Sequence, residues 1–207
     1  AENGPMGIMD LSAELGFHKS TTHRLVTSLQ YMGYIRQDEE SLKYALSLKF
    51  LEIGSKILEQ TNMASLIHPS LKKLSEQTGE TVHLVRREGT EAVYIDKVES
   101  TVSSIRMVSR VGSRIPLYCS GVGKALLAEL PDPEIEDIWN SSEITSLTPY
   151  TVTRLSDLME RIRGVREAGY AMDDEENEEG VRCIAVSIPD YHKEPVYALS
   201  ISAPVSR

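Results

Sequence analysis

The most constraining feature of the sequence is a pair of short predicted helices separated by a glycine. Leu11 and Leu15 lie four residues apart, so they share one face of a helix, and Gly16 directly after them is typical of a helix C-cap. A second helix is predicted to begin at His18 or Lys19. Two short helices joined by a turn that contains glycine are typical of a helix-turn-helix.

The second of these helices has two distinct faces. Residues spaced i, i+3, i+4 and i+7 form one buried stripe, made of Thr22, Leu25, Val26 and Leu29. On the opposite face, arginine can pair with guanine, threonine can meet a thymine methyl, and Lys and Ser at the helix start suit phosphates. A solvated helix face is the alternative on these residues alone. The candidate DNA-reading residues are Lys19, Ser20, Thr21, His23, Arg24 and Ser28.

A β-hairpin is predicted directly after this helix. Short, partly alternating runs at 34–37 and 42–46 flank the polar tip 38–41, and a hairpin in this place is a wing. The tip is acidic and should be repelled by phosphates, whereas Arg36 and Lys43 on its flanks are placed to reach the DNA backbone. We therefore expect the wing to contribute less than the helix.

The remaining sequence mixes helices and strands. Helices are predicted at 47–63, from His68-Pro69 to Gly79, and at 124–130, 133–139 and 153–168, with strands at 81–86, 92–98, 104–111, 182–188 and 196–202. Hairpin-like strand pairs favour an α+β fold over a doubly wound sheet. We expect three parts: a DNA-binding domain (1–47), a linker helix (48–64) and an effector-binding domain (65–207).

The overall charge limits how the chain can bind nucleic acid. Its 207 residues carry a formal net charge of −9, which excludes a protein that coats nucleic acid without sequence preference. A local DNA-reading surface is still possible, because the segment from Phe17 to Arg36 contains three basic residues and no acid.

Neither a membrane span nor a signal peptide is predicted. No apolar run approaches the roughly 18 residues of a membrane helix, and no basic segment followed by an apolar stretch opens the chain. Cys119 and Cys183 lie far apart among small or apolar residues, which favours buried thiols in a reducing compartment over a disulfide. We therefore expect a cytoplasmic protein that does not engage membranes.

The segment Gly121-Val122-Gly123 directly precedes a predicted helix. Backbone N–H groups at a helix start make an anion site, and Lys124 adds a charge nearby. The segment is not a Walker A loop, because Tyr118 stands where that motif needs glycine and Ala125 replaces its Ser or Thr. On spacing alone, a plain helix N-cap is the favoured interpretation.

Three motifs together resemble the IclR family of bacterial transcription regulators: LSAELGFHKSTTHRLVTSL, PLYCSGVGKALLA and EEGVRCIAVSIPD. Within that family the sequence is most similar to regulators of sugar-acid catabolism of the KdgR kind. The resemblance implies an N-terminal winged helix-turn-helix joined by a linker helix to a GAF-like effector-binding domain. It also implies binding to double-stranded operator DNA as a homodimer or homotetramer. The family's first helix is expected to be largely absent from this chain, and its C-terminal helix absent.

The resemblance also implies a set of effector contacts. A small hydroxy acid or keto acid would place its carboxylate on the loop amides, Asp173 would accept a hydrogen bond from a hydroxyl, and Cys183 would form a wall. Ser200 and Ser202 alternate on a strand, so they point to one face. The implied residues are Gly121, Val122, Asp173, Cys183, Ser200 and Ser202.

No metal site, cofactor or catalytic group is predicted. The histidines lack metal-ligand spacing, and the acidic run 173–180 lacks the spacing of a calcium loop. The leading hypothesis is a ligand-controlled transcription factor, favoured as a repressor. Two alternatives remain: a small-molecule enzyme using Cys183 as nucleophile near Asp173, and a ligand sensor that acts by protein contact.

Overall fold

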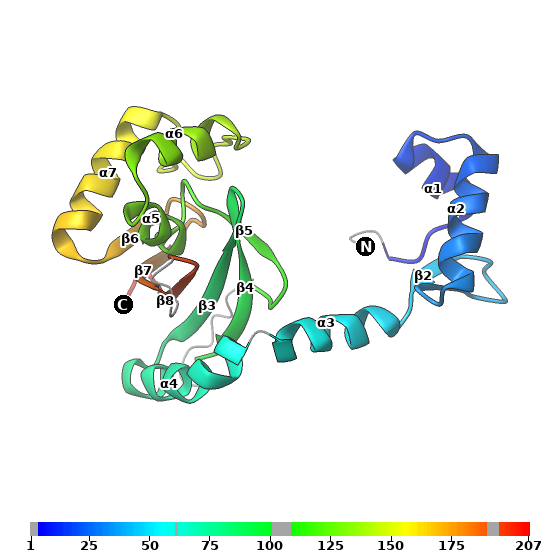
Figure 1. Ribbon diagram of the computed structural model, residues 1–207, viewed down its shortest axis with the longest axis horizontal. Coiled ribbons are helices and arrows are strands. Elements are labelled where there is room, and N and C mark those ends of the chain that lie inside the picture. The colour runs from blue at the N-terminus through cyan, green and yellow to red at the C-terminus, as the bar shows by residue number, and fades with distance from the viewer. Residues whose placement is uncertain (1–3, 61, 101–108, 190–194) are drawn as a thin grey trace. The chain divides into compact units, whose positions relative to one another are not determined.

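The computed structural model describes residues 4–60, 62–100, 109–189 and 195–207, with the side chains of 57–63 left aside. The chain divides into two compact units, Ala1–Asn62 and Met63–Arg207. Each unit has its own secondary structure and is considered by itself (Figure 1).

The first unit contains the predicted helix-turn-helix. Helix α1 spans Ile8–Leu15 and helix α2 spans Lys19–Tyr31. Gly16 caps α1 with a φ of 65°, a left-handed conformation that only glycine adopts without strain, and His18 is the N-cap of α2. The predicted end of α1 and the predicted start of α2 are confirmed.

The apolar stripe of α2 is only partly buried. Thr22 and Val26 are buried, but Leu25 and Leu29 remain 46% and 39% exposed. The eight-residue α1 packs against α2 and covers only part of the stripe. The prediction of one continuous buried stripe is therefore correct for half of its residues.

The wing follows α2 as a short antiparallel hairpin. Strand β1 (Ile35–Gln37) pairs with β2 (Tyr44–Leu46), and Met6 forms an isolated bridge with Tyr44. Helix α3 (Lys49–Gln60) then begins.

The joint between α2 and α3 is built from polar contacts. Lys49 at the start of α3 donates from Nζ to the carbonyl of Met32 at 2.6 Å and lies 4.6 Å from the centre of the Tyr34 ring. Ser47 donates from Oγ to the carbonyl of Gly33. The carbonyls of the C-cap of α2 and of the glycine after it are thus bound by the segment that opens α3.

The second unit is an antiparallel sheet with helices on both faces, which confirms the predicted α+β class. Six strands lie in the order β5-β4-β3-β8-β7-β6. The strands are β3 (Thr81–Glu88), β4 (Glu91–Val98), β5 (Arg114–Pro116), β6 (Ala171–Asp174), β7 (Val181–Ile188) and β8 (Tyr197–Pro204). The helices are α4 (Asn62–Thr78), α5 (Gly121–Ala128), α6 (Asp132–Asn140) and α7 (Leu155–Ala168).

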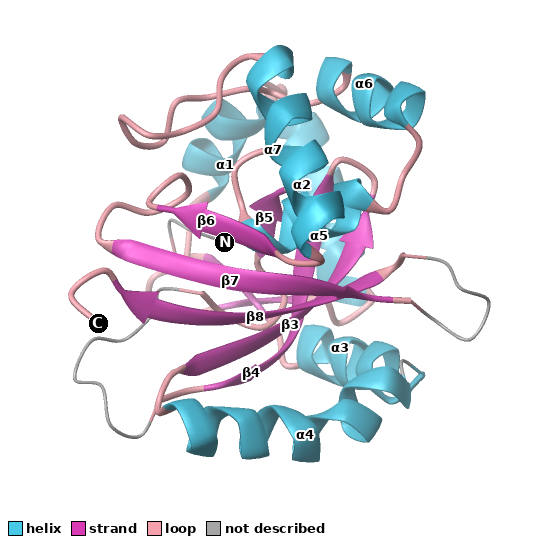
Figure 2. Ribbon diagram, turned by 90° about the vertical axis from the view of Figure 1, so that its left-hand side faces the viewer, coloured by secondary structure: helices cyan, strands magenta, loops and turns pink. Residues whose placement is uncertain are grey.

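The two faces of the sheet carry separate cores. Helices α5, α6 and α7 lie over one face, where buried residues such as Leu126, Leu158 and Ala185 pack together (Figure 2). Helix α4 covers part of the other face, with Leu71 packed against Leu84 and its neighbours. This arrangement places the N-terminus of α5 against the sheet.

Two predicted elements need correction. Helix α4 begins at Asn62 rather than at His68, and Pro69 lies inside it. Proline removes the hydrogen bond to the carbonyl of Ser65, but packing of the helix on the sheet outweighs that loss. Of the strand predicted at 104–111, residues 104–108 lie outside the described residues and 109–111 are not in a strand, whereas β5 lies at Arg114–Pro116.

Gly123 offers a direct test of how α5 is seated. A Cβ at this position would overlap with the backbone oxygen, Cα and carbonyl carbon of Leu117, and backbone cannot give way as a side chain can. We expect Gly123→Ala to destabilise the second unit by about 3 kcal/mol or more, which lowers its Tm by about 10 °C.

Calorimetry of the full chain measures this shift. Gly164→Ala is the matched control, because nothing lies within 4 Å of a Cβ there, and its Tm should stay equal or rise slightly. Equal Tm values for both variants would show that α5 is not held by this close approach.

Candidate functional site

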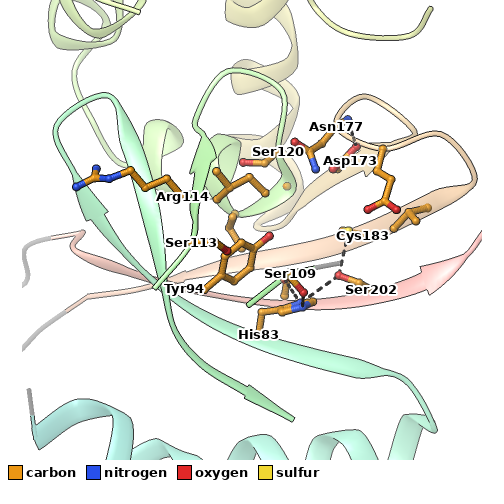
Figure 3. Close-up of a pocket in the computed structure, with 16 residues that line it drawn as sticks. His83, Tyr94, Ser109, Ser113, Arg114, Ser120, Asp173, Asn177, Cys183 and Ser202 are labelled. Carbon is orange, nitrogen blue, oxygen red and sulfur yellow. Dashed lines mark hydrogen bonds between the residues drawn. The ribbon is translucent and has the colours of Figure 1, made fainter. Parts of the chain in front are cut away.

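A cavity of about 450 Å³ lies between the sheet and the N-terminus of α5 (Figure 3). All six residues implied as effector contacts line it, although they come from positions spread over 80 residues of sequence. They are Gly121, Val122, Asp173, Cys183, Ser200 and Ser202. The structure therefore brings the whole predicted set together at one place.

Strand register explains why these residues meet. Asp173 on β6 is directly opposite Cys183 on β7, which is directly opposite Ser202 on β8. Ser200 lies two residues before Ser202 on β8, so both side chains point to the same face as predicted, and the structure shows that both are buried. One row of the sheet thus forms the floor of the cavity.

The N-terminus of α5 closes one end of this cavity. Ser120 is its N-cap, with Oγ accepting from the amide of Gly123 at 3.1 Å and donating to the carbonyl of Pro116 at 2.6 Å. The amides of Gly121 and Val122 have no hydrogen-bond partner among the described residues. Two free N–H groups at the positive end of a helix can bind an anion.

Lys124 does not add its charge to the cavity, contrary to what the sequence suggested. Its side chain is 1% exposed, and Nζ lies 2.5 Å from Oε1 of Glu176, which is also buried. A cation with a partner this close is neutralised locally. The ammonium therefore links α5 to the turn after β6 instead of serving as a free anion partner.

His83 on β3 is the main residue that the sequence analysis missed. Its Nε2 lies 2.7 Å from Oγ of Ser109, and its Nδ1 lies 3.3 Å from Oγ of Ser202 and 3.5 Å from Oγ of Ser200. Burial, helped by the charge of Lys97, lowers the pKa of His83 to about 4. The ring is therefore neutral at physiological pH and orients the serine hydroxyls. A histidine inside the apolar strand TVHLV was the available signal.

The thiol of Cys183 is a poor nucleophile. Burial first, and then the charge of Asp173, raise the pKa of this thiol to about 12. Its Sγ lies 3.0 Å from Oγ of Ser202. Since the thiolate is the reactive form, the side chain acts as a wall of the cavity.

Asp173 is 3% exposed and sits at the end of the cavity next to α5. Its Oδ1 accepts from the amide of Glu176 at 2.8 Å and from that of Asn177 at 3.3 Å. Burial raises the pKa of this carboxyl to about 6, against the opposing effect of the Lys124 charge. This acid therefore titrates close to neutral pH.

Other lining residues are not among the six that the resemblance implied. Tyr94, Ser113, Asn177 and Glu178 line the cavity, as does Arg114. The guanidinium of Arg114 extends away from the cavity in Figure 3 and pairs with Glu88 at 2.6 Å and Glu91 at 3.2 Å. The resemblance gave none of these residues a role, and they reach the cavity from β4, from β5 and the residue before it, and from the turn after β6.

The predicted DNA-reading residues lie on α2, and all are exposed. They are Lys19, Ser20, Thr21, His23, Arg24 and Ser28. Oγ of Ser28 donates to the carbonyl of Arg24 at 2.9 Å, so this hydroxyl offers lone pairs rather than its proton to a partner. The surface is thus available to a ligand along its length.

The wing tip is acidic and ordered. Oδ1 of Asp38 accepts from the amide and the hydroxyl of Ser41 at 2.8 and 2.7 Å, and these hydrogen bonds lower the pKa of Asp38. The tip therefore keeps its negative charge. Arg36 and Lys43 line a hollow on the hairpin together with the tip residues Asp38 and Ser41.

Among the described residues, no three metal-binding side chains are clustered, and no helix is long and apolar enough to cross a membrane. Cys119 and Cys183 are both free thiols.

Family models match both units of the chain. The model for the IclR helix-turn-helix domain matches residues 1–39, and the model described as bacterial transcriptional regulator IclR C-terminal matches residues 55–207.

Curated relatives agree with these matches. The transcriptional repressor IclR of Escherichia coli is 36% identical over 207 residues, with 99% of this chain and 75% of the relative covered. The regulator KdgR of Escherichia coli is 38% identical over 206 residues, with 100% and 78% covered. Among solved structures, the Thermotoga maritima IclR has a TM-score of 0.76 at 34% identity, covering 98% of this chain and 81% of that one.

These relatives are transcriptional regulators and not enzymes, so the alternative of an enzyme that uses Cys183 is wrong, in agreement with its protonated thiol. The helix-turn-helix, the antiparallel sheet with its cavity, and the matches over both units lead to one assignment. The chain belongs to the IclR family of bacterial transcriptional regulators.

Proposed function

We propose that this protein is a repressor whose binding to double-stranded operator DNA is controlled by a small carboxylate, such as a sugar acid or a keto acid. The observation that carries the proposal is the pair of free amides of Gly121 and Val122, which end a cavity rimmed by hydroxyl groups. Several relatives are named as repressors, including IclR and YiaJ of Escherichia coli, which supports repression here. As a transcriptional regulator that binds DNA, it acts in the cytoplasm.

The effector contacts divide by chemistry. The amides of Gly121 and Val122 receive the carboxylate, and Ser200 and Ser202 bind hydroxyl or keto oxygens. Asp173 contributes a carboxyl group beside the amides, and Cys183 closes the wall. The cavity volume of about 450 Å³ suits a small molecule.

The DNA contacts lie on one face of α2. Arg24 reads base edges in the major groove with Thr21, while Lys19 and Ser20 hold phosphates at the helix start. His23 and Ser28 lie beside them. The protein acts as a homodimer or homotetramer, since a symmetric operator needs paired recognition helices.

Control of DNA binding requires the effector to have different affinities for two arrangements of the protein. A second candidate, a sensor that acts through protein contact, uses the same cavity but not the face of α2. Replacing the exposed Arg24 on that face distinguishes a DNA-binding repressor from a sensor that acts through protein contact.

Replacing Arg24 should weaken operator binding. Loss of a bidentate base contact costs about 1–3 kcal/mol, so we expect Arg24→Ala to bind the DNA upstream of the protein's own gene about 10- to 100-fold more weakly. Fluorescence anisotropy at fixed salt measures this. Arg161→Ala, which removes the same charge from α7, is the control and should bind as the wild type does. Full-strength binding by Arg24→Ala would favour the protein-contact sensor.

A screen of carboxylates tests the cavity. We expect one or more of gluconate, glycerate and pyruvate to raise the Tm of the second unit and to change operator affinity. Ser202→Ala should weaken binding of that compound about fivefold, because it removes one hydrogen bond of about 1 kcal/mol. Ser156→Ala, at an exposed site on α7, is the control. A panel without effect on either measurement would refute control by small carboxylates.

Assembly is testable by itself. Light scattering coupled to size-exclusion chromatography should give two or four times the 23.1 kDa of one chain. A monomer that binds operator at full affinity would contradict the paired arrangement.

A further inference from the structure

The charges that line the cavity are unfavourable for a carboxylate ligand. Two acids line it, Asp173 and Glu178, and neither forms an ion pair with a described cation. The nearby cations already have carboxylate partners: Arg114 pairs with Glu88 and Glu91, Lys124 with Glu176, and Lys97 with Glu99. Among the described lining residues, negative charge therefore exceeds positive charge.

The amides that would hold a carboxylate, at the start of α5, are neighbours of Asp173, the acid that would repel it. A methyl group placed on Gly121 would lie 3.5 Å from Cβ and from the amide nitrogen of Asp173. A carboxylate bound to the amides of Gly121 and Val122 therefore lies beside the carboxyl group of Asp173. Two carboxylates in contact within a buried site do not both stay ionised, and one of them takes up a proton.

We propose that the effector carboxylate binds together with one proton, taken from solvent, that resides on Asp173. The inference rests on the proposed function, since it concerns the same ligand. Asp173–COO⁻ and H⁺ become Asp173–COOH as the ligand enters. Oδ1 keeps its two backbone hydrogen bonds, and Oδ2–H donates to the ligand. Asp173 is then a donor to the carboxylate, rather than the acceptor that the sequence suggested.

The surroundings of Asp173 favour this assignment. The titratable groups that interact with it are Lys124 from α5, Cys119 before α5, Cys183 from β7, Tyr94 from β4 and Glu176 from the turn after β6, while Glu178 from that turn interacts with Tyr94 and Cys183. Both thiols and the phenol are protonated near neutral pH, because burial raises the pKa of each of them.

The other acid and the histidine are less suited to take the proton. Glu178 is exposed, so solvent screens its charge. The pKa of His83 is lowered to about 4 by burial, so it would need a much larger shift to charge on binding. The pKa of Asp173 is already raised to about 6 before any ligand is present, so only a small further rise is needed for Asp173 to be protonated near neutral pH.

The affinity for a carboxylate should fall as the pH rises. Asp173 in the free protein is largely ionised at pH 7, and a bound carboxylate raises its pKa further. Affinity is therefore highest below the free pKa and falls as pH rises through and above it. Between pH 6 and pH 8 the loss approaches about fiftyfold if the bound state stays protonated.

Calorimetry in two buffers measures the proton directly. The full chain is titrated with gluconate, glycerate and pyruvate at pH 7 in MOPS and in Tris, whose ionisation enthalpies differ, and again at pH 5.5 and pH 8. We expect uptake approaching about 0.9 protons per carboxylate at pH 7 and far less at pH 5.5. Glycerol, the uncharged counterpart of glycerate, should show no uptake.

Asp173→Asn is the informative variant, because the amide keeps the shape and the Oδ1 acceptor but cannot titrate. It should bind the carboxylate without proton uptake and with nearly equal affinity at pH 6 and pH 8. Asp174→Asn is the matched control: Asp174 is adjacent on β6, points to the opposite face and pairs with Arg182, so it should behave as the wild type.

Each outcome has one meaning. Uptake that is present in the wild type and lost in Asp173→Asn supports the inference. Carboxylate binding without uptake overturns it and leaves the proposed function standing, and uptake that persists in Asp173→Asn overturns the assignment to Asp173. Failure of all three carboxylates to bind at pH 5.5 and at pH 8 overturns the proposed function itself, and this inference with it.

Discussion

The buried ion pair between Lys124 and Glu176 is the contact on which the site depends. It joins the first turn of α5, which supplies the free amides, to the turn that directly follows β6, the strand that carries Asp173. Two threonine hydroxyls also hold this turn. Thr148 donates to the carbonyl of Glu175 at 2.6 Å, and Thr151 donates to the carbonyl of Glu176 at 2.6 Å. Buried pairs cost desolvation, so this one contributes more to fixing one geometry than to net stability.

Periodicity and glycine placement predicted much of the fold. The helix-turn-helix follows from Leu11, Leu15 and Gly16, and the alternation of Ser200 with Ser202 was enough to put both on one face. The start of α4 was not predictable in this way, because Pro69 is a local signal against a helix. Long-range packing of Leu71 on the sheet decides that region, and sequence periodicity does not report it.

Only the residues of the candidate site that the family resemblance implied could be predicted from the sequence. Strand register aligns four of the six expected effector residues, Asp173, Cys183, Ser200 and Ser202, and the packing of α5 on the sheet brings Gly121 and Val122 to them, but both are long-range properties. His83 reaches the same floor from β3, and no spacing rule links it to Ser200, which lies opposite on β8. The true partner of Lys124 was likewise hidden, since Glu176 stood within an acidic run that a solvated loop would explain.

The polar joint between α2 and α3 has a mechanical consequence. Because Lys49 and Ser47 tie the carbonyls of the two residues that follow α2, Met32 and Gly33, to the start of α3, we expect the two helices to turn together. The N-terminal end of α2 at Lys19, where we propose that DNA is read, is 13 residues and so about 20 Å from this pivot. A tilt on the order of 10° at the pivot then carries Lys19 through about 3 Å, close to the rise of one base pair along DNA. In the proposed function, a turn of α3 this small is therefore enough to shift Lys19 relative to an operator.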